Sequence, residues 1–328
     1  MTPTVSPVRN RFSRFRLQLG LTAMFLALLG LFMITSPQAF LSWRIYVSFL
    51  STIPFSALLA LGLTLLIIAG EMDLSFPSVM AVTGLAFSWC FQETGSTSLA
   101  FFMGLFTGVF AGLINGLIVV KIGVPSIVAT IGMQFFWRGL ATLLSDGLAL
   151  SLVPIRETAI REIFVGRIAG LVPAQAIWCV ILAIGLWFLL NRHVFGDHIF
   201  FIGDNSRTAQ SMGIPVDFTK IMLFVLMGLF AALTSVMVCL EMANWWPTHG
   251  DGYLLLVFAA VFIGGNSVFG GQGTIYGTMI GACIIGILEA GIISSGWSGY
   301  WTRLIYGVII VVCVSIYALG MKMKNHRG

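Results

Sequence analysis

Two acidic residues, Glu71 and Asp73, lie between two long apolar runs, and Ser75 and Ser78 follow them closely. Paired acids in such a place could bind a cation or relay protons. They could equally belong to the start of the next helix, because an acid or a serine there satisfies free N–H groups and matches the helix dipole. The sequence leaves both interpretations open.

A second group of charges is spread over later apolar segments. Arg138 lies about 18 Å along its own segment at a rise of 1.5 Å per residue. Glu241 and Glu289 reach a similar level in two other segments, and Arg303 begins the last one. Buried charges are costly unless they face a cavity or a partner. These four could pair to fix helix positions, or they could line the mouth of a passage.

The spacing of the cysteines, histidines and glycines does not indicate a catalytic or metal site. The cysteines are few, far apart and inside apolar runs, and the four histidines show no ligand spacing. The glycine-rich stretch "GGNSVFGGQG" lacks the lysine and Ser/Thr of a phosphate-binding loop. We therefore expect no enzymatic activity and no cofactor or metal on this chain. The five cysteines are Cys90, Cys179, Cys239, Cys283 and Cys313.

The composition identifies the kind of environment in which these residues lie. Of 328 residues, 58% are hydrophobic and only 9% are charged, with a mean hydropathy of +1.00. Soluble domains carry about 25% charged residues. The sequence therefore predicts an all-α polytopic membrane protein embedded in a lipid bilayer. The net charge of +5 comes from short basic clusters, without the basic, aromatic-rich face that would suggest nucleic-acid binding.

About ten segments are long and apolar enough to be spans, at roughly 20 residues each. The eighth is short and ends in glycine, so it is a candidate for a partial span. Most of the 17 Lys and Arg residues fall inside if both termini are cytoplasmic, although an eight-span count passes the same test. The expected spans are 17–35, 52–70, 76–92, 99–120, 126–145, 173–191, 220–243, 253–265, 275–293 and 301–320.

This topology divides the chain into one membrane domain and two tails. We expect a cytoplasmic tail over 1–16, a single transmembrane domain over 17–320 and a cytoplasmic tail over 321–328. The basic segment "VRNRFSRFRLQLG" has no convincing cleavage site after it, which favours a retained first helix over a signal peptide. Glycines at 104, 108 and 112 recur every four residues and predict close helix packing.

The longer external loop, 146–172, contains an amphipathic pattern. Pro154 suits a first helical turn, and Ile155, Ala159 and Ile163 would share one face of a helix. Glu157 and Arg161 have the spacing of a favourable ion pair. Such a helix could dock an external partner, or it could only seal the bundle.

The cytoplasmic loop, 192–219, contains a polar stretch, "FFIGDNSRTAQSMGIPVDF", with marked helix ends. Asp204 or Asn205 can cap the N-terminus by accepting a bond from a free N–H. Gly213 suits the left-handed position just after the C-terminus, and Pro215 prevents continuation. We interpret this short helix as a contact for a partner that supplies energy.

Four segments, in this order, resemble the motifs of one family. They are "GEMDLSFPSVMAVTG", "PSIVATIGMQFFWRGLA", "FIGDNSRTAQSMGIPV" and "FIGGNSVFGGQGTIYGTMIGACIIGILEAG". They are similar to segments of bacterial ABC permeases of the ribose and other sugar type, whose relatives also carry the AI-2 signal. The resemblance runs from about residue 50 to residue 320.

The resemblance implies a type II-like ABC importer permease bundle in the bacterial inner membrane. Its implied partners are a second permease copy or paralogue, a cytosolic ABC ATPase that could be a fused double-ATPase chain, and a periplasmic solute-binding protein. ATP and Mg would bind only to the ATPase. The implied ATPase-contact residues are Asp204, Asn205, Arg207, Thr208, Ala209, Ser211, Met212, Gly213 and Ile214.

The substrate pathway is predicted from polar residues and tryptophans within or beside the spans. The tryptophans could stack on a sugar, although they also suit a membrane interface. The expected pathway residues are Asp73, Ser75, Asn115, Gln134, Arg138, Glu241, Trp245, Trp246 and Glu289.

Several positions depart from the family pattern and leave the solute open. Glu71 and Pro77 stand where glycines are usual, Gln210 and Met212 where Ala and Ser are usual, and Glu289 where an asparagine is common. Ordinary ribose or hexose specificity therefore does not follow. The alternative is a proton- or ion-coupled secondary transporter that uses Glu71 and Asp73. A membrane-embedded enzyme or scaffold has no nucleophile–base or metal constellation in its favour.

Overall fold

The computed structural model describes residues 7–325 of the chain. The helices are α1 (Pro7–Thr35), α2 (Pro37–Phe40), α3 (Trp43–Ile68), α4 (Phe76–Thr94), α5 (Thr97–Leu117), α6 (Ser126–Leu144), α7 (Ala159–Val165), α8 (Ala174–Arg192), α9 (Val194–Ser211), α10 (Val216–Met242), α11 (Tyr253–Ile263), α12 (Ile275–Ser294) and α13 (Tyr300–Asn325). A π-helical turn η1 (Ile118–Ile122) and a 3-10 turn η2 (Val153–Glu157) accompany them. The strands are β1 (Leu150–Ser151), β2 (Arg167–Ile168), β3 (Val172–Pro173) and β4 (Asn244–Trp245).

The described helices confirm the all-α polytopic prediction, and seven of them are long and apolar enough to cross a membrane. Each predicted span coincides with one helix. These helices are α1, α3, α4, α5, α6, α8, α10, α11, α12 and α13.

Three of these helices, α4, α11 and α13, are not among the seven. Helix α4 carries several hydroxyl residues and is buried among its neighbours. Helix α11 has 11 residues, which makes it about 16 Å long at 1.5 Å per residue. That is about half of a hydrocarbon core of roughly 30 Å. For helix α13, the part whose side chains the structure describes without a gap, Tyr300–Ser315, is apolar but has only 16 residues.

The helical ends differ from the predicted tails. Helix α1 already begins at Pro7 and α13 continues to Asn325, so part of each predicted tail is helical. Residues 1–6 and 326–328 of those tails lie outside the described residues.

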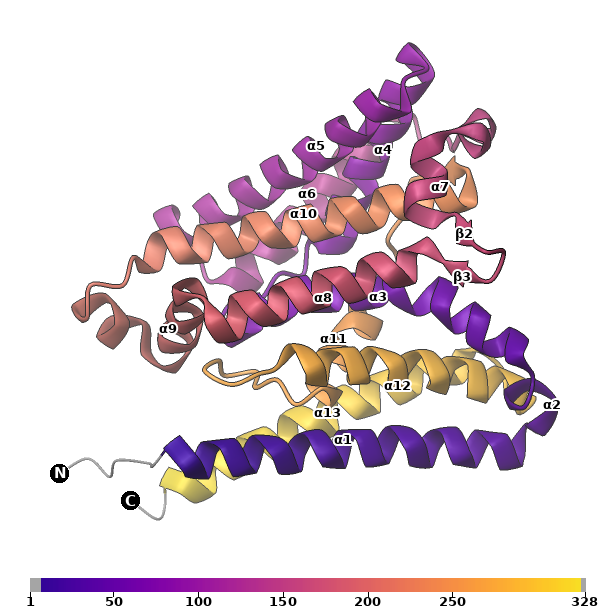
Figure 1. Ribbon diagram of the computed structural model, residues 1–328. Helices are drawn as coiled ribbons and strands as arrows, with labels where there is room; N and C mark the ends of the chain where they lie inside the picture. Colours follow the sequence, from indigo (N-terminus) through magenta and orange to yellow (C-terminus); the bar gives the residue numbers. More distant parts are fainter. Residues whose placement is uncertain (1–6, 326–328) are drawn as a thin grey trace.

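Helix α3 forms the centre of the bundle. Its apolar window is 83% buried, and its neighbours include α8, α10, α11 and α12. Figure 1 shows it behind α8, with α10 above it and α12 below it. A helix that is apolar on all sides suits such a position, because none of its faces needs contact with water. Gly62 helps, because a Cβ there would meet Met227 and Phe230 of α10 at 3.1 Å.

The glycine repeat in α5 forms the close helix contact that the sequence predicts, and its partner is α10. A Cβ added at Gly108 would collide with Ala232 and with the Gly228 carbonyl, and one at Gly112 would collide with the Phe224 carbonyl. Without side chains at these points, the two backbones lie in close contact. Helix α4 packs on the same pair and completes a three-helix layer.

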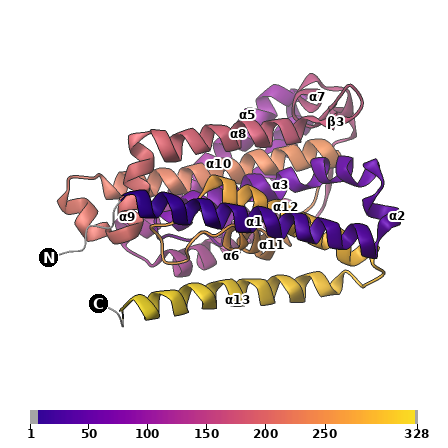
Figure 2. The same ribbon diagram turned by 60° about the horizontal axis from the view of Figure 1, so that its bottom comes forward.

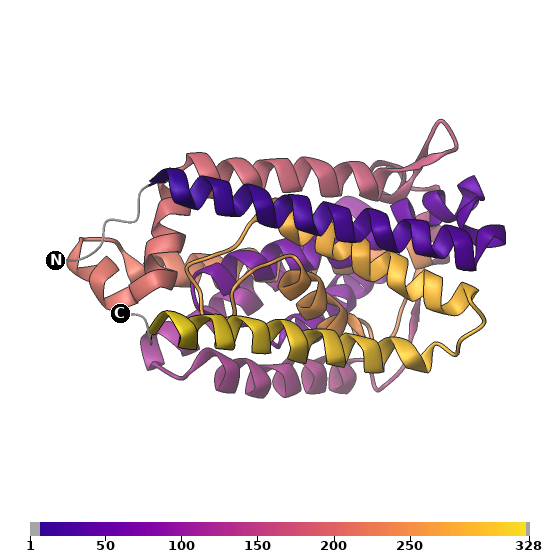
Figure 3. The same cartoon turned by 90° about the horizontal axis from the view of Figure 1, so that it is seen from below.

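The two ends of the bundle carry different elements. The described chain ends and α9 lie at one end, and α2, α7 and the β2–β3 hairpin lie at the other (Figures 1, 2 and 3). The capped loop and both termini therefore share one side of the protein. The charge distribution predicts that this side is cytoplasmic.

The loop 146–172 folds differently from the predicted single amphipathic helix. Thr158, with φ −96° and ψ 144°, separates η2 from α7. Arg161 pairs with Glu162 at 3.1 Å, so the predicted pair with Glu157 is wrong. Phe164 stacks on Phe101 and Trp178, with ring centroids 4.7 and 5.2 Å away. These contacts seal α7 onto the bundle.

Candidate functional site

The polar stretch in 192–219 forms the end of α9, and its helix ends match the sequence prediction. Asn205 is not helical, with φ −159° and ψ 103°, so α9 bends there. Its Oδ1 accepts a hydrogen bond from Thr208 N at 3.0 Å, which caps the short helix that follows. Gly213 has φ +82° and Pro215 follows it. The sequence did not predict the longer helix, 194–204, before the bend.

We call residues 204–214 the capped segment. Most of its side chains face solvent, and Met212 is 62% exposed although it is apolar. Ala209 is the exception, because it is 1% exposed and packs into the core. Ile214 is half-buried, and its N–H donates to the Ala209 carbonyl at 3.1 Å. The exposed residues are Asp204, Asn205, Arg207, Thr208, Gln210, Ser211, Met212 and Gly213.

The capped segment is joined to the bundle through a glycine contact. A Cβ at Gly203 would collide with the carbonyl of Ile68, the last residue of α3, and would crowd the N–H of Gly271. Gly271 N–H donates to that same Ile68 carbonyl at 2.8 Å. Displacement of α9 would therefore act directly on the end of α3 and on the loop before α12.

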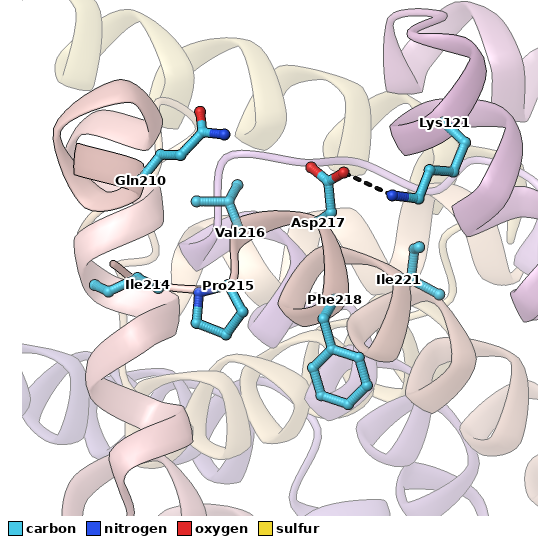
Figure 4. A pocket seen from close by; sticks show the side chains of 8 residues that line it. All are labelled: Lys121, Gln210, Ile214, Pro215, Val216, Asp217, Phe218 and Ile221. Carbon is cyan, nitrogen blue, oxygen red and sulfur yellow. Dashed lines mark hydrogen bonds and ion pairs between the residues drawn. The ribbon is translucent and has the colours of Figure 1, made fainter. Parts of the chain in front are cut away.

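A groove of about 390 Å³ lies beside the capped segment. Figure 4 shows Gln210 on one side, Lys121 on the other, and a dashed line joining Lys121 to Asp217 between them. The groove is lined by Lys121, Gln210, Ile214, Pro215, Val216, Asp217, Phe218 and Ile221. Phe218 is exposed, so this end of the protein combines apolar and charged contact surface.

Two ion pairs hold the start of α10 next to this groove. Lys121 Nζ lies 2.8 Å from Asp217 Oδ2, and both side chains are more than half exposed. Lys220 Nζ lies 2.6 Å from Glu71 Oε1, with side chains only 18% and 12% exposed. Glu71 therefore fixes α10 to the α3–α4 connection.

Asp73 belongs to a different, buried network. Its Oδ1 accepts hydrogen bonds from Ser75 N and Ser75 Oγ at 2.7 and 2.6 Å. Asn115 Nδ2 donates to Ser75 Oγ at 2.7 Å, and Trp137 Nε1 donates to Asn115 Oδ1 at 3.3 Å. Because Glu71 and Asp73 have separate partners, the geometry favours the helix-start interpretation over a shared cation site.

Arg138 is the centre of a cluster near the opposite end. Its Nη1 donates to the carbonyls of Pro247 and His249 at 2.6 and 2.8 Å. Its Nη2 donates to the Pro77 carbonyl at 3.3 Å and to Asp251 at 2.6 Å. One guanidinium thus joins α6, the start of α4 and the loop 243–252. Sequence reasoning missed Asp251, whose only signal is a turn-like Asp–Gly pair.

His249 is buried within this loop. Burial lowers its pKa to about 4, and the positive charge of Arg138 lowers the pKa further in the same direction. The Trp246 ring packs edge-on against it, with centroids 5.0 Å apart. The imidazole is therefore neutral at physiological pH.

The remaining predicted pathway residues have varied surroundings. Trp245 is fully buried and its Nε1 donates to the Ala81 carbonyl at 3.0 Å. Gln134 and Glu241 are half-buried, and their side chains make no hydrogen bond to another described residue. Glu289 accepts one long bond, 3.4 Å, from the Tyr306 hydroxyl.

The four charges at the common level do not pair with one another. Arg138 forms its ion pair with Asp251 instead. The other ion pairs in the described part of the chain include none of Glu241, Glu289 and Arg303. Among those same residues, no group of three or more His, Cys, Asp or Glu side chains could hold a metal ion. The five cysteines are unpaired thiols.

Comparison with known proteins defines the class of this molecule. Residues 45–314 match the family described as the permease component of branched-chain amino acid transport systems. The chain belongs to this family of ABC transporter permeases and is a multi-pass membrane permease, not an enzyme.

Relatives cover nearly the whole chain. A probable ABC transporter permease of Escherichia coli K12, YphD, is 32% identical over 92% of this chain and 90% of its own. The ribose import permease RbsC of Bacillus subtilis 168 is 32% identical over 81% of this chain and 82% of its own. The autoinducer 2 import permease LsrD of Yersinia enterocolitica is 27% identical over 97% of this chain and 95% of its own.

Proposed function

We propose that this chain is the translocating subunit of an ATP-driven importer in the bacterial inner membrane. It carries a monosaccharide or a sugar-like solute inward by alternating access. The relatives named for ribose and autoinducer 2 import support this solute class. A cytosolic ATPase, a periplasmic binding protein and a second permease subunit complete the transporter.

The capped segment is the observation that carries the proposal. It is an exposed short helix with capped ends, on the same side as both chain ends (Figure 1). Its attachment at Gly203 contacts the end of α3, the central helix. Closure of an ATPase dimer against this short helix would displace it as a rigid unit, and its contact at Gly203 would transmit the displacement to α3.

The proposal is tested by placing charges on the exposed face of the capped segment. Met212→Asp and Thr208→Glu alter side chains that face solvent, so the protein should still insert and fold. In vesicles that contain the complete transporter, we expect uptake to fall about tenfold or more while the ATPase loses its stimulation by solute. The matched control is Asp197→Asn, an exposed position on the same helix before the bend.

Uptake that continues unchanged in both charge variants would contradict the proposed role of the capped segment. Ala209 is not suitable for this test, because a charge at a buried position would disturb folding. The rival mechanism, ion-coupled transport, predicts that collapse of the proton gradient at constant ATP stops uptake. Our proposal predicts that uptake persists under that condition.

A further inference from the structure

A cavity of about 470 Å³ lies between α3, α12 and the start of α11. It is at the end of the bundle away from the chain ends, where α3 begins after α2 (Figure 1). Its volume is within the range of roughly 300–1,000 Å³ of small-molecule sites. We call it the α3–α12 cavity. The polar residues that line it are Ser48, Thr52, Ser56, Asp251, Tyr253 and Glu289.

One wall of this cavity is a row of hydroxyl groups. Ser48, Thr52 and Ser56 are four residues apart on α3, so they share one helix face. Thr52 Oγ1 donates to the Ser48 carbonyl, and Ser56 Oγ donates to the Ile53 carbonyl, both at 3.0 Å. The protons of the Thr52 and Ser56 hydroxyls are thus in use, but their lone pairs remain able to accept a hydrogen bond from a ligand.

The opposite wall carries oxygen atoms that could accept hydrogen bonds but have few donors within the protein. The charge of Asp251 is balanced by Arg138 at 2.6 Å. The Glu289 carboxylate has a single long bond from Tyr306, and the Tyr253 hydroxyl makes no hydrogen bond to another described residue. A carboxylate has about four acceptor positions, so most of those on Glu289 are unused. No Lys or Arg lines the cavity.

We propose that the α3–α12 cavity binds an uncharged, polyhydroxylated solute of monosaccharide size, with Glu289 accepting bonds from two of its hydroxyl groups. The inference rests on the proposed import function and adds a location and a binding residue to it. The Glu289 carboxylate has no cationic partner among the described residues, so the cavity disfavours anions. A solute rich in hydroxyl donors satisfies both walls, because it can donate to Glu289 and to the α3 hydroxyls.

The test measures access to the cavity directly. A reporter variant, Ser48→Cys, is made after the half-buried Cys90, Cys283 and Cys313 are changed to alanine. The purified full-length permease in nanodiscs is treated with a cationic and with an anionic methanethiosulfonate. Modification is then repeated with neutral pentoses and hexoses, with gluconate as the anionic probe and with glucosamine as the cationic probe.

We expect the cationic reagent to react several-fold faster than the anionic one, and a neutral monosaccharide to slow modification. Glu289→Gln should weaken this protection about tenfold, as for loss of a hydrogen bond to a charged group. Glu93→Gln is the control, because Glu93 carries the same kind of carboxylate but is exposed and does not line the cavity.

Three results would overturn the inference. They are protection by glucosamine alone, protection by gluconate alone, and no protection by any probe. Uptake by the complete transporter is measured in parallel with the same variants. If uptake of neutral sugars is intact while the reporter is never protected, the cavity proposal fails and the importer proposal stands. If neutral sugars protect the reporter but uptake is absent or ATP-independent, the importer proposal fails instead.

Discussion

Arg138 and Asp251 form an ion pair of 2.6 Å that joins α6 to the loop before α11. The same guanidinium donates to three main-chain carbonyls, those of Pro77, Pro247 and His249. The arginine is mostly buried, with 22% of its side chain exposed, whereas Asp251 is 58% exposed. The carbonyl contacts therefore account for more of the stabilisation than the ion pair does.

The first prediction separates these two contributions. Arg138→Met leaves the carbonyls without donors and should lower the free energy of unfolding by about 2–4 kcal/mol. Asp251→Asn should lower it by less than about 1 kcal/mol, because an exposed carboxylate contributes little. Thermal unfolding of both purified variants in detergent gives the comparison. Equal losses in the two variants would show that the carbonyl contacts are unimportant.

The second prediction concerns pH and His249. Burial, followed by the charge of Arg138, lowers its pKa from 6.5 to about 4. As the pH falls below 6.5, His249 becomes protonated in the unfolded chain but stays neutral in the folded protein. Stability therefore decreases until the pH reaches about 4. The loss of unfolding free energy is at most about 3–4 kcal/mol, at about 1.4 kcal/mol per pH unit. Melting temperatures from pH 7 to pH 4 should fall less steeply for His249→Gln than for the parent.

If the melting temperature falls equally with pH in the parent and in His249→Gln, the lowered pKa of His249 is contradicted. Both proteins contain the same carboxyl groups, which also titrate toward pH 4. The difference between the two curves therefore isolates the imidazole, whatever the variant does to stability at pH 7.

The third prediction compares the two ion pairs at the start of α10. Double-mutant cycles with Glu71→Gln and Lys220→Met should give a coupling energy of about 1–3 kcal/mol, because the pair is largely buried. The cycle with Lys121→Met and Asp217→Asn should give less than about 1 kcal/mol, because that pair is exposed. A larger coupling for the exposed pair would reverse our reading of this region.

The fourth prediction tests the glycine contact between α9 and α3. Gly203→Ala places a methyl group against the Ile68 carbonyl, so we expect a lower melting temperature and poor accumulation in the membrane. Gly185→Ala in α8 is the control, because a Cβ there meets nothing within 4 Å. The control should be neutral or stabilising by up to about 1 kcal/mol. A stable Gly203→Ala protein would mean that α9 can move away from α3 at little cost.

Helix positions could be predicted from this sequence because apolar length and local end signals determine them. The glycine repeat of α5 and the Asn205 cap are examples, since each depends on neighbours within a turn or on one repeated spacing. The partners of buried charges could not be predicted. Arg138 meets Asp251 across more than a hundred residues of chain, and Glu71 meets Lys220 in the same way.

Burial within a polar segment was also beyond the sequence. Ala209 lies among polar residues and yet faces the core, because only one side of a short surface helix packs against the bundle. The break at Thr158 had no clear signal either, so the loop before α8 was predicted as one helix.

The central claim is that an ATP-hydrolysing partner binds the capped segment. A photo-crosslinking amino acid at Met212, 62% exposed, is compared with one at Ile163 of α7, which is 53% exposed at the opposite end. In membranes that contain the complete transporter, the account predicts an adduct between Met212 and the ATPase and none from Ile163. An ATPase adduct from Ile163, or none from Met212 in an actively transporting complex, would contradict it.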